Sequence, residues 1–473
     1  MRLFFNNRPI ILSDIEKIDS SIVKIDDNVS FQSDEFGYAP VYYYKDDHEH
    51  HIFDNTKACL DLKEEFLDKQ ALCDFLRYRF IPDGKTLDKR IIRLGPQDRL
   101  ILKEENIVFS KKEETIFEKQ NRLSLKDLLI RYFEKIRKKE VHIMFSGGID
   151  STLLVIAAYL AGKEVFTYSI DIQENGFSEA KFRKDIIKRY VKEHKELLLS
   201  KEDYLSALKA LIDKRDIPFI YQDTSAFVWL IEKSDIPADE VFFGLGGDEW
   251  FFGYDRMVFS YMERILSNRF DLDSYGSDDI KGLSSIILSE IKDRVISPFK
   301  YISKVFDQDI ISKVLLSKVY PEKNNQFKDG NTVNSIIDFE YKQEFPFNQA
   351  VRLNSIQEAT GKKILLPFIQ EEIFQLAIGL SFEDMMRNGR KKDIFFKEFK
   401  DYLPEDILKK KKSGFRIPLK NWFESEAWDI INKLVLNKPS LKNILNISKL
   451  EYEVRNKYTS EQKWYIMMLI HML

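Results

Sequence analysis

The hexapeptide SGGIDS, Ser146 to Ser151, lies between the apolar run VHIMF at 141–145 and the apolar run STLLVIAAYLAG at 151–162. The first run predicts a short buried strand, and the second predicts a helix that stops at its final glycine. The two glycines let the backbone turn tightly and present consecutive N–H groups to an anion, and the helix start adds positive partial charge. The sequence therefore predicts a phosphate-binding turn, although a plain strand–turn–helix connection can have the same residues.

A second glycine-rich stretch, GLGGDEWFFGY at 244–254, follows the short apolar run VFF. It places a carboxylate, Asp248, at the end of another predicted strand, where ligands gather in open α/β sheets. Asp150 and Asp248 can therefore hold Mg²⁺ from opposite sides, since Mg²⁺ binds carboxylate and phosphate oxygens. The first turn has no GxxxxGK[ST] lysine, which argues against a Walker-type γ-phosphate site. Read alone, the second stretch can also be a glycine-rich loop with a solvated acid.

The regions around these motifs alternate between strand and helix patterns. EVFTYSIDI at 164–172 predicts a strand, SEAKFRKDIIKRYVKEH at 178–194 a helix, and KELLLS at 195–200 another strand. Such alternation predicts an α/β fold with a parallel sheet covered by helices on both faces. Residues 255–473 read as mostly helical, and residues 1–115 as β-rich, with a hairpin in 40–54.

Composition excludes several classes of protein. Lys and Arg number 74 against 77 Asp and Glu, a formal charge of −3, so nothing indicates binding to nucleic acid or acidic membranes. This balance argues against a tRNA-modifying enzyme with a similar pyrophosphate loop. Two cysteines, Cys59 and Cys73, indicate a reducing compartment, and the apolar runs are too short to cross a bilayer. With no signal sequence at the N-terminus, we expect a soluble, cytoplasmic protein.

In their order and spacing these motifs resemble the synthetase domain of the asparagine synthetase superfamily, which includes β-lactam synthetases and lasso-peptide cyclases. Further stretches agree with it: IDKRDIPF at 212–219, LLPFIQEEIFQLAIGL at 365–380 and KKKKSGFRIPLKNWF at 409–423. The resemblance implies a PP-loop, adenine-nucleotide α-hydrolase-like α/β domain with a helical C-terminal part at 119–473. It also implies a β-rich, truncated glutaminase-like domain at 1–118, on the evidence of SDEFGYAPVYYY at 33–44 and FDNTKACL at 53–60.

The resemblance further implies a chemistry. A substrate carboxylate would attack the α-phosphate of ATP to give an acyl-adenylate and pyrophosphate, and an amine would then displace AMP. Lys412 would stabilise charge on the adenylate and the tetrahedral intermediate, although the lysine run 409–412 can also be a solvated helix end or a nucleic-acid patch. Ile170 and Gly244 would lie near the adenosine, and Asp150 and Asp248 would hold Mg²⁺. The pyrophosphate portion would be held by Ser146, Gly147, Gly148, Asp150 and Ser151.

Two positions depart from the family pattern. Glutamine-hydrolysing members have a nucleophilic cysteine at position 2, where this sequence has Arg2, so we expect no glutamine hydrolysis. Where asparagine synthetases have Glu and β-lactam synthetases have Tyr, this sequence has Leu245, which cannot accept a proton. A substrate amine with a pKa near the working pH, or a carboxylate such as Glu249 or Glu358, can take over that role.

Other groups have simpler interpretations. The run HEHH at 48–51 is expected to be a solvated hairpin turn rather than a metal site. His142 is expected on a strand beside the core, and His194 as a contact at the end of a helix. The aromatic run 250–252 can either pack in the core or line an apolar acceptor pocket.

Together these features predict an AMP-forming amide ligase with ATP and Mg²⁺ as cofactors and a degenerate N-terminal domain. Its expected partners are small-molecule or peptide carboxylates and amines, in the biosynthesis of a specialised metabolite or a modified peptide. The alternatives are a lasso-type peptide macrolactam cyclase and a non-catalytic ATP-binding pseudoenzyme. The oligomeric state stays open, a homodimer included.

Overall fold

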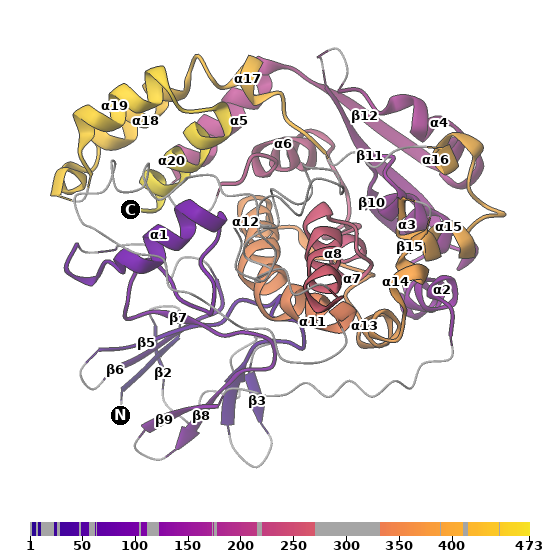
Figure 1. Cartoon of the computed structure of the whole chain (residues 1–473), viewed down its shortest axis with the longest axis horizontal. Coiled ribbons are helices and arrows are strands. Elements are labelled where there is room, and N and C mark those ends of the chain that lie inside the picture. The colour runs from indigo at the N-terminus through magenta and orange to yellow at the C-terminus, as the bar shows by residue number, and fades with distance from the viewer. Residues whose placement is uncertain are drawn as a thin grey trace.

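The computed structural model is shown in Figure 1, whose labels for helices and strands are used below. Lys412 and residues 111–122 lie outside the described part of the chain. The described residues are 2–5, 8–10, 23–25, 29–46, 49–55, 62, 64–103, 106–110, 123–172, 174, 177–214, 220–269, 332–387, 389–409, 415–443 and 445–473.

A five-stranded parallel sheet of order β12-β11-β10-β13-β14 forms the middle of the synthetase region. Helices pack on it, with α2 and α3 in contact with each other and α3 also beside α4 (Figure 1). The predicted α/β architecture with a parallel sheet is therefore confirmed. The elements are α2 (Leu125–Lys135), β10 (Glu140–Met144), α3 (Ile149–Leu160), β11 (Glu164–Ile172), α4 (Ala180–Tyr190), β12 (Glu193–Leu199), α5 (Lys201–Lys214), α6 (Thr224–Lys233), β13 (Glu240–Phe242) and β14 (Lys363–Leu365).

The boundary between α4 and β12 differs from the sequence prediction. The helix expected over 178–194 ends at Tyr190, because Val191 is extended and the Lys192 N–H donates to the Val165 carbonyl at 2.8 Å, which begins strand pairing. His194 therefore lies on β12, where its Nδ1 is 2.8 Å from the Thr167 hydroxyl, and the predicted helix-end contact is wrong. His142 lies buried on β10, as predicted.

The N-terminal region contains a five-stranded sheet of order β2-β1-β6-β5-β7 and a four-stranded sheet of order β3-β4-β8-β9. The predicted hairpin is confirmed, since β5 pairs antiparallel with β6. The strands are β1 (Arg2–Phe5), β2 (Arg8–Ile10), β3 (Val23–Ile25), β4 (Val29–Gln32), β5 (Tyr42–Asp46), β6 (Glu49–Phe53), β7 (Ile92–Arg93), β8 (Arg99–Lys103) and β9 (Asn106–Ser110).

His50 and His51 are buried on β6, so the solvated turn predicted for HEHH is wrong for this pair. The His51 ring stacks between Phe4 and Tyr44, with centroid distances of 4.7 and 4.4 Å. Its place on a central strand of the sheet covers it on both sides, which the alternating polar sequence could not reveal. Burial lowers the pKa of both imidazoles below the ordinary value of 6.5.

These histidines predict acid sensitivity of the fold. Because the pKa values are lowered in the folded state, the unfolded chain binds more protons below pH 6.5. Their contribution to stability is therefore complete above pH 6.5 and lost as the pH falls toward the lowered values. We expect the urea midpoint to fall between about pH 8 and about pH 5. The variant His51→Phe, which keeps the ring stack, should show a smaller fall, and an equal fall would contradict this assignment.

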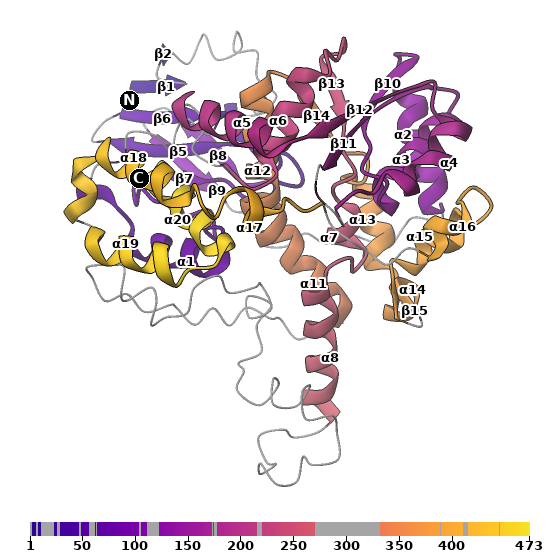
Figure 2. The same cartoon turned by 90° about the horizontal axis from the view of Figure 1, so that it is seen from above.

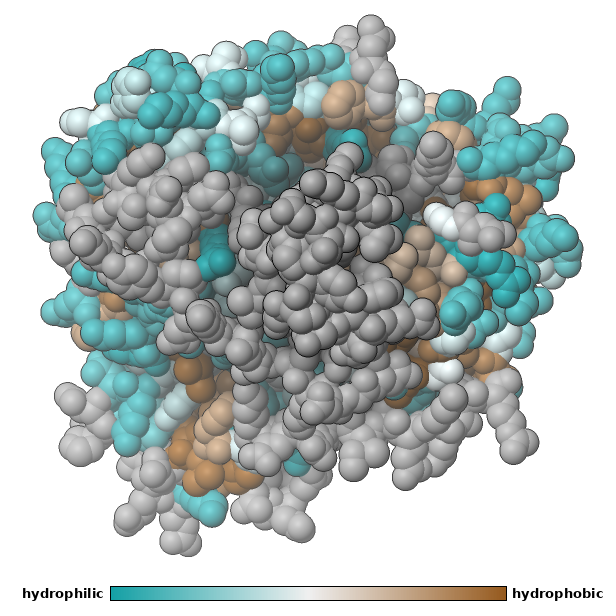
Figure 3. Space-filling model, viewed as in Figure 1, coloured by the Kyte–Doolittle hydropathy of each residue, from teal (hydrophilic) through white to brown (hydrophobic). Residues whose placement is uncertain are grey.

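The described part of residues 255–473 is mostly helical, as predicted. Figure 2 shows α8 and α11 running side by side away from the body. In the face seen in Figure 3, hydrophobic residues lie in separate patches among hydrophilic ones. Over the described residues, no helix is long and apolar enough to cross a membrane. The longer helices are α8 (Asp255–Arg269), α11 (Thr332–Phe339), the π-helix η5 (Glu340–Gln349), α12 (Ala350–Thr360), α13 (Glu371–Ile378), α18 (Ala427–Leu436), α19 (Ile447–Asn456) and α20 (Ser460–Met472).

The N-terminal region packs tightly on the helical half. Helix α1 (Lys69–Tyr78) buries Leu72 and Phe75 in the same hydrophobic core as the parallel sheet. Hydrogen bonds add to this packing: the Tyr38 hydroxyl donates to the Ile364 carbonyl at 3.0 Å. Helix α1 thus shares the core of the parallel sheet, whereas the strands of the N-terminal sheets pack in clusters of their own around Phe31 and Tyr42. The domain division near residue 118 stays a prediction.

Candidate ATP-binding site

The hexapeptide 146–151 forms the turn from β10 into α3, at the carboxyl end of the strand, as predicted. The Gly148 N–H donates to the Ser146 hydroxyl at 3.1 Å, and the Ser146 and Ser151 hydroxyls are 3.2 Å apart. Gly147 has a φ of +83°, and a Cβ there would lie 2.8 Å from Cγ of Arg183. Glycine is thus required at this position both by backbone conformation and by space.

Arg183 holds this turn through a hydrogen bond to the backbone. Its guanidinium is 1% exposed, donates to the Ser146 carbonyl at 3.2 Å and pairs with Glu196 at 2.5 Å. A buried guanidinium with paired charge holds its neighbours in one geometry. Nothing in the sequence distinguishes Arg183, because its position on α4 resembles that of any other basic residue in the helix.

The second glycine-rich loop packs directly against the first. A Cβ on Gly244 would lie 3.0 Å from the Ser151 nitrogen, and a Cβ on Gly247 would lie 2.3 Å from Oδ1 of Asp150. Only residues without a side chain allow this approach. The two motifs that the sequence placed about a hundred residues apart are therefore brought into contact, and Asp150 and Asp248 come to share one neighbour.

That neighbour is Lys392, which precedes α15 (Asp393–Glu398). Its ammonium pairs with Asp150 and with Asp248, the latter at 2.5 Å, and its side chain is 1% exposed. Burial alone would lower the pKa of Lys392, but the two carboxylates outweigh it and the pKa is raised. Sequence reasoning missed Lys392, since no motif surrounds it and only the tertiary contact distinguishes it from its neighbour Lys391.

The donor set fits a magnesium–pyrophosphate group. Asp150 and Asp248 already converge on a single cation, and Mg²⁺ in phosphate sites is usually held by one or two carboxylates while phosphate oxygens and water complete its shell. In the described part of the chain no cluster of three or more His, Cys, Asp or Glu side chains offers a metal site formed by protein alone. A magnesium ion held by these two aspartates would take its remaining ligands from phosphate oxygens and water.

Of the remaining predicted site residues, some lie near the turn and one falls outside the described part of the chain. Ile170 lies buried on β11, which pairs with β10, the strand that precedes the SGGIDS turn. Gly244 lies where the two glycine-rich loops meet. Lys412 falls outside the described residues. Leu245 is half-buried against the core. The structure therefore brings Ser146–Ser151, Gly244 and Asp248 together. The roles of these residues, and those of Ile170 and Lys412, stay predictions.

Burial contradicts two further hypotheses, which are Glu249 as the base and the aromatic run at 250–252 as an acceptor pocket. Glu249 is fully buried; its carboxylate accepts from the Gly246 N–H at 2.8 Å and from the Tyr254 hydroxyl at 2.5 Å, so it holds the loop rather than a substrate. The aromatic run at 250–252 is also fully buried, with Trp250 against Phe374 at 5.0 Å. The acceptor-pocket interpretation of these aromatics is wrong, because they fill the space between helices. Glu358 lies half-buried on α12.

Comparison with known proteins agrees with this geometry. The asparagine synthase family model matches residues 135–473, which contain both glycine-rich loops and Lys392. The chain belongs to the asparagine synthase family. It is 20% identical over 431 residues to asparagine synthetase [glutamine-hydrolyzing] 1 of Bacillus subtilis (strain 168), covering 85% of this chain and 67% of that protein. It is 23% identical over 302 residues to asparagine synthetase [glutamine-hydrolyzing] 3 of the same organism, covering 57% of this chain and 44% of that protein.

Membership of the asparagine synthase family identifies the chain as an ATP-dependent carbon–nitrogen ligase, in which ATP is converted to AMP and pyrophosphate. The family match begins before β10 and runs to the last helix. It therefore includes the parallel sheet, both loops and the helical half, but not the N-terminal sheets.

Proposed function

We propose that this asparagine synthase family member adenylates a substrate carboxylate and couples it to an amine or to ammonia without hydrolysing glutamine. The observation that carries the proposal is the convergence of Asp150, Asp248 and Lys392 beside the SGGIDS turn. Two carboxylates and one ammonium beside a glycine turn suit a magnesium-bound pyrophosphate, which is the leaving group of an adenylation.

Each group has a part in this chemistry. Asp150 and Asp248 would hold Mg²⁺, which would supply positive charge to the pyrophosphate oxygens. The Lys392 ammonium neutralises charge on the same leaving group, and the turn N–H groups and serine hydroxyls orient it. The substrate carboxylate oxygen attacks the α-phosphorus as the bond to pyrophosphate breaks. An amine nitrogen then attacks the acyl carbon, AMP departs with the bonding electrons, and Lys412 is proposed to stabilise the charge that develops.

The source of the amine distinguishes this proposal from the activity in the relatives' names. Of the cysteines, Cys73 is fully buried, and burial raises its pKa to about 11. A thiol in that state has almost no thiolate at neutral pH and cannot serve as a glutaminase nucleophile. Cys59 lies outside the described residues. We therefore propose that ammonia or an amino group on a substrate supplies the nitrogen.

Leu245 limits the kinds of amine that can act as the acceptor. A leucine cannot take a proton from the attacking amine, and Glu249 is buried in the loop. An amine that is partly neutral at the working pH needs no base to deprotonate it before attack, and the proton that it loses after attack can pass to the departing AMP phosphate or to water. We propose an acceptor amine of lowered pKa, as found on specialised metabolites and on modified peptides. A lasso-type peptide cyclase and an ATP-binding pseudoenzyme remain the alternative outcomes of the test.

The test is pyrophosphate release from ATP and Mg²⁺ with a panel of carboxylates and peptides, each with ammonia, a weakly basic amine such as an arylamine or hydroxylamine, or glutamine. We expect one class of carboxylate to trigger release of pyrophosphate and AMP, with ammonia or amines but not glutamine giving amide. Turnover with glutamine would overturn the proposed nitrogen source. ATP binding without turnover on any carboxylate would instead favour the pseudoenzyme.

A further inference from the structure

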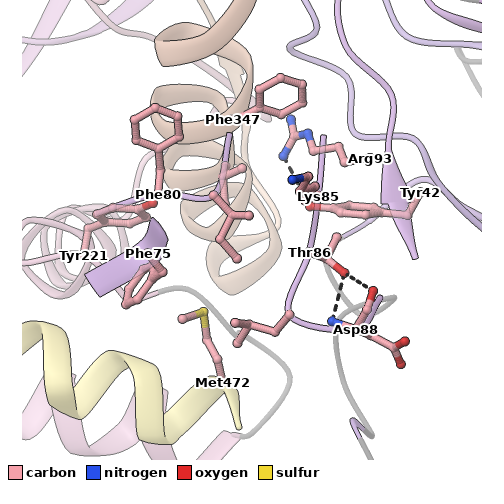
Figure 4. Close-up of a pocket in the computed structure, with 13 residues that line it drawn as sticks. Tyr42, Phe75, Phe80, Lys85, Thr86, Asp88, Arg93, Tyr221, Phe347 and Met472 are labelled. Carbon is pink, nitrogen blue, oxygen red and sulfur yellow. Dashed lines mark hydrogen bonds between the residues drawn. The ribbon is translucent and has the colours of Figure 1, made fainter. Parts of the chain in front are cut away.

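A pocket of about 570 Å³, counted with its open mouth, lies where the N-terminal sheet, α1, α12 and α20 meet. Figure 4 shows aromatic side chains around it, among them Phe75, Phe80, Tyr221 and Phe347. Part of this space opens to solvent, and most of the side chains that line it are apolar. Apolar walls with a few polar groups are the usual character of small-molecule sites.

The polar group that stands out in this wall is Arg93, the last residue of β7. It is 4% exposed. Two of its nitrogens donate to neutral acceptors, the Tyr42 hydroxyl and the Gly37 carbonyl, each at 3.2 Å, and its Nε has no hydrogen-bond partner. Figure 4 shows the side chain reaching toward Tyr42 in the upper part of the pocket.

Arg93 has no carboxylate partner within the described part of the chain. This contrasts with the buried Arg183, which pairs with Glu196, and with the partly buried Arg256, which pairs with Glu340 at 2.6 Å. A buried charge is normally paired, because leaving water costs free energy that only an opposite charge or several good hydrogen bonds recover. Neutral acceptors at 3.2 Å are weak compensation.

The other charges around the pocket do not supply the missing anion. Asp88 lines the pocket, but Arg90 holds it through two nitrogens at 3.0 and 2.7 Å. Lys85 is a second cation in the lining. With Asp88 paired to Arg90, no carboxylate among the lining residues is left to pair with Arg93.

We propose that this pocket binds a small carboxylate with an aromatic body, whose carboxylate pairs with Arg93 while its ring packs among Phe75, Phe80 and Phe347. The site is separate from the ATP loops, because none of its lining residues lies in 146–151 or 244–249, and Lys392 is not among them. The proposal therefore does not depend on the ligase chemistry. A ligand here would contact the N-terminal sheet, α12 and Met472 of α20 at once, and so would stabilise their packing.

The experiment uses phenylacetate as the probe, titrated into the full chain by calorimetry and followed by thermal unfolding. We expect one saturable site and a rise in Tm. Phenylacetamide, which has the same shape but no charge, should bind at least about tenfold more weakly. Asp150→Asn should leave phenylacetate binding unchanged, which separates this site from the proposed ATP site.

Variants locate the anion partner. Arg93→Met should weaken phenylacetate binding at least about tenfold, whereas Arg93→Lys should retain most of it. Arg455→Met, at an exposed arginine on α19, is the matched control and should bind as the parent does. If Arg93→Met is poorly folded, Val351→Phe, which fills the pocket from α12, tests the same site and should abolish binding. Equal binding of phenylacetamide, unchanged binding in Val351→Phe or in folded Arg93→Met, or no saturable binding to the parent would each overturn the proposal.

Discussion

Replacing Asp150 by asparagine is expected to lower ATP-dependent pyrophosphate release by at least about 10²-fold, at saturating ATP and Mg²⁺. Asp150 and Asp248 converge on Lys392 beside the turn, and Asp150 pairs with its ammonium. Asparagine keeps the shape but loses the charge that holds Mg²⁺ and aligns the ammonium. The loss should therefore appear in kcat and in the Mg²⁺ concentration needed for half-maximal rate.

The matched control is Asp235→Asn, at an aspartate whose side chain is 90% exposed. It should keep the parent rate within about twofold, because exposed ion pairs contribute little. The assay requires only the carboxylate that triggers pyrophosphate release, not the final amide. A rate for Asp150→Asn within about threefold of the parent would show that the paired aspartates are not the magnesium site.

Replacing Lys392 by methionine is expected to have two large effects. The ammonium is almost fully buried between Asp150 and Asp248, so its removal leaves two carboxylates facing each other without a cation. We expect a loss of about 2–3 kcal/mol in the free energy of unfolding, toward the low end for a broken buried pair because the aspartates are partly exposed. We also expect pyrophosphate release to fall by about 10²-fold.

Mg²⁺ distinguishes this mechanism from a simple packing defect. In the variant the two carboxylates have lost their cation, so Mg²⁺ should raise Tm more than it does in the parent. The adjacent Lys391, which pairs with Asp255 and is 20% exposed, provides the control Lys391→Met. That control should show neither the large stability loss nor the added response to Mg²⁺. An identical Mg²⁺ response in Lys392→Met and the parent would contradict the proposed arrangement.

Local sequence predicted the elements of the synthetase region well where the pattern was strong. The run VHIMF became β10, EVFTYSIDI became β11 to the residue, and the helix after SGGIDS became α3. Prediction was weaker at ends and on short elements. The end of α4 depended on strand pairing by Lys192, and β14 is a three-residue strand whose pairing with β13 is non-local. Such contacts leave no periodic signal in a single sequence.

The sequence by itself determined the chemistry of the site: two glycine turns at strand ends, with one carboxylate in each. Those choices are readable because only glycine allows the positive φ of Gly147 and the close approach of Gly244 to the first loop. The tertiary structure alone decided which side chains complete the site and which are excluded. Lys392 and Arg183 join it, and Glu249 and Trp250 are buried away from it. Burial and charge pairing depend on residues far apart in the chain, so no local pattern can specify them.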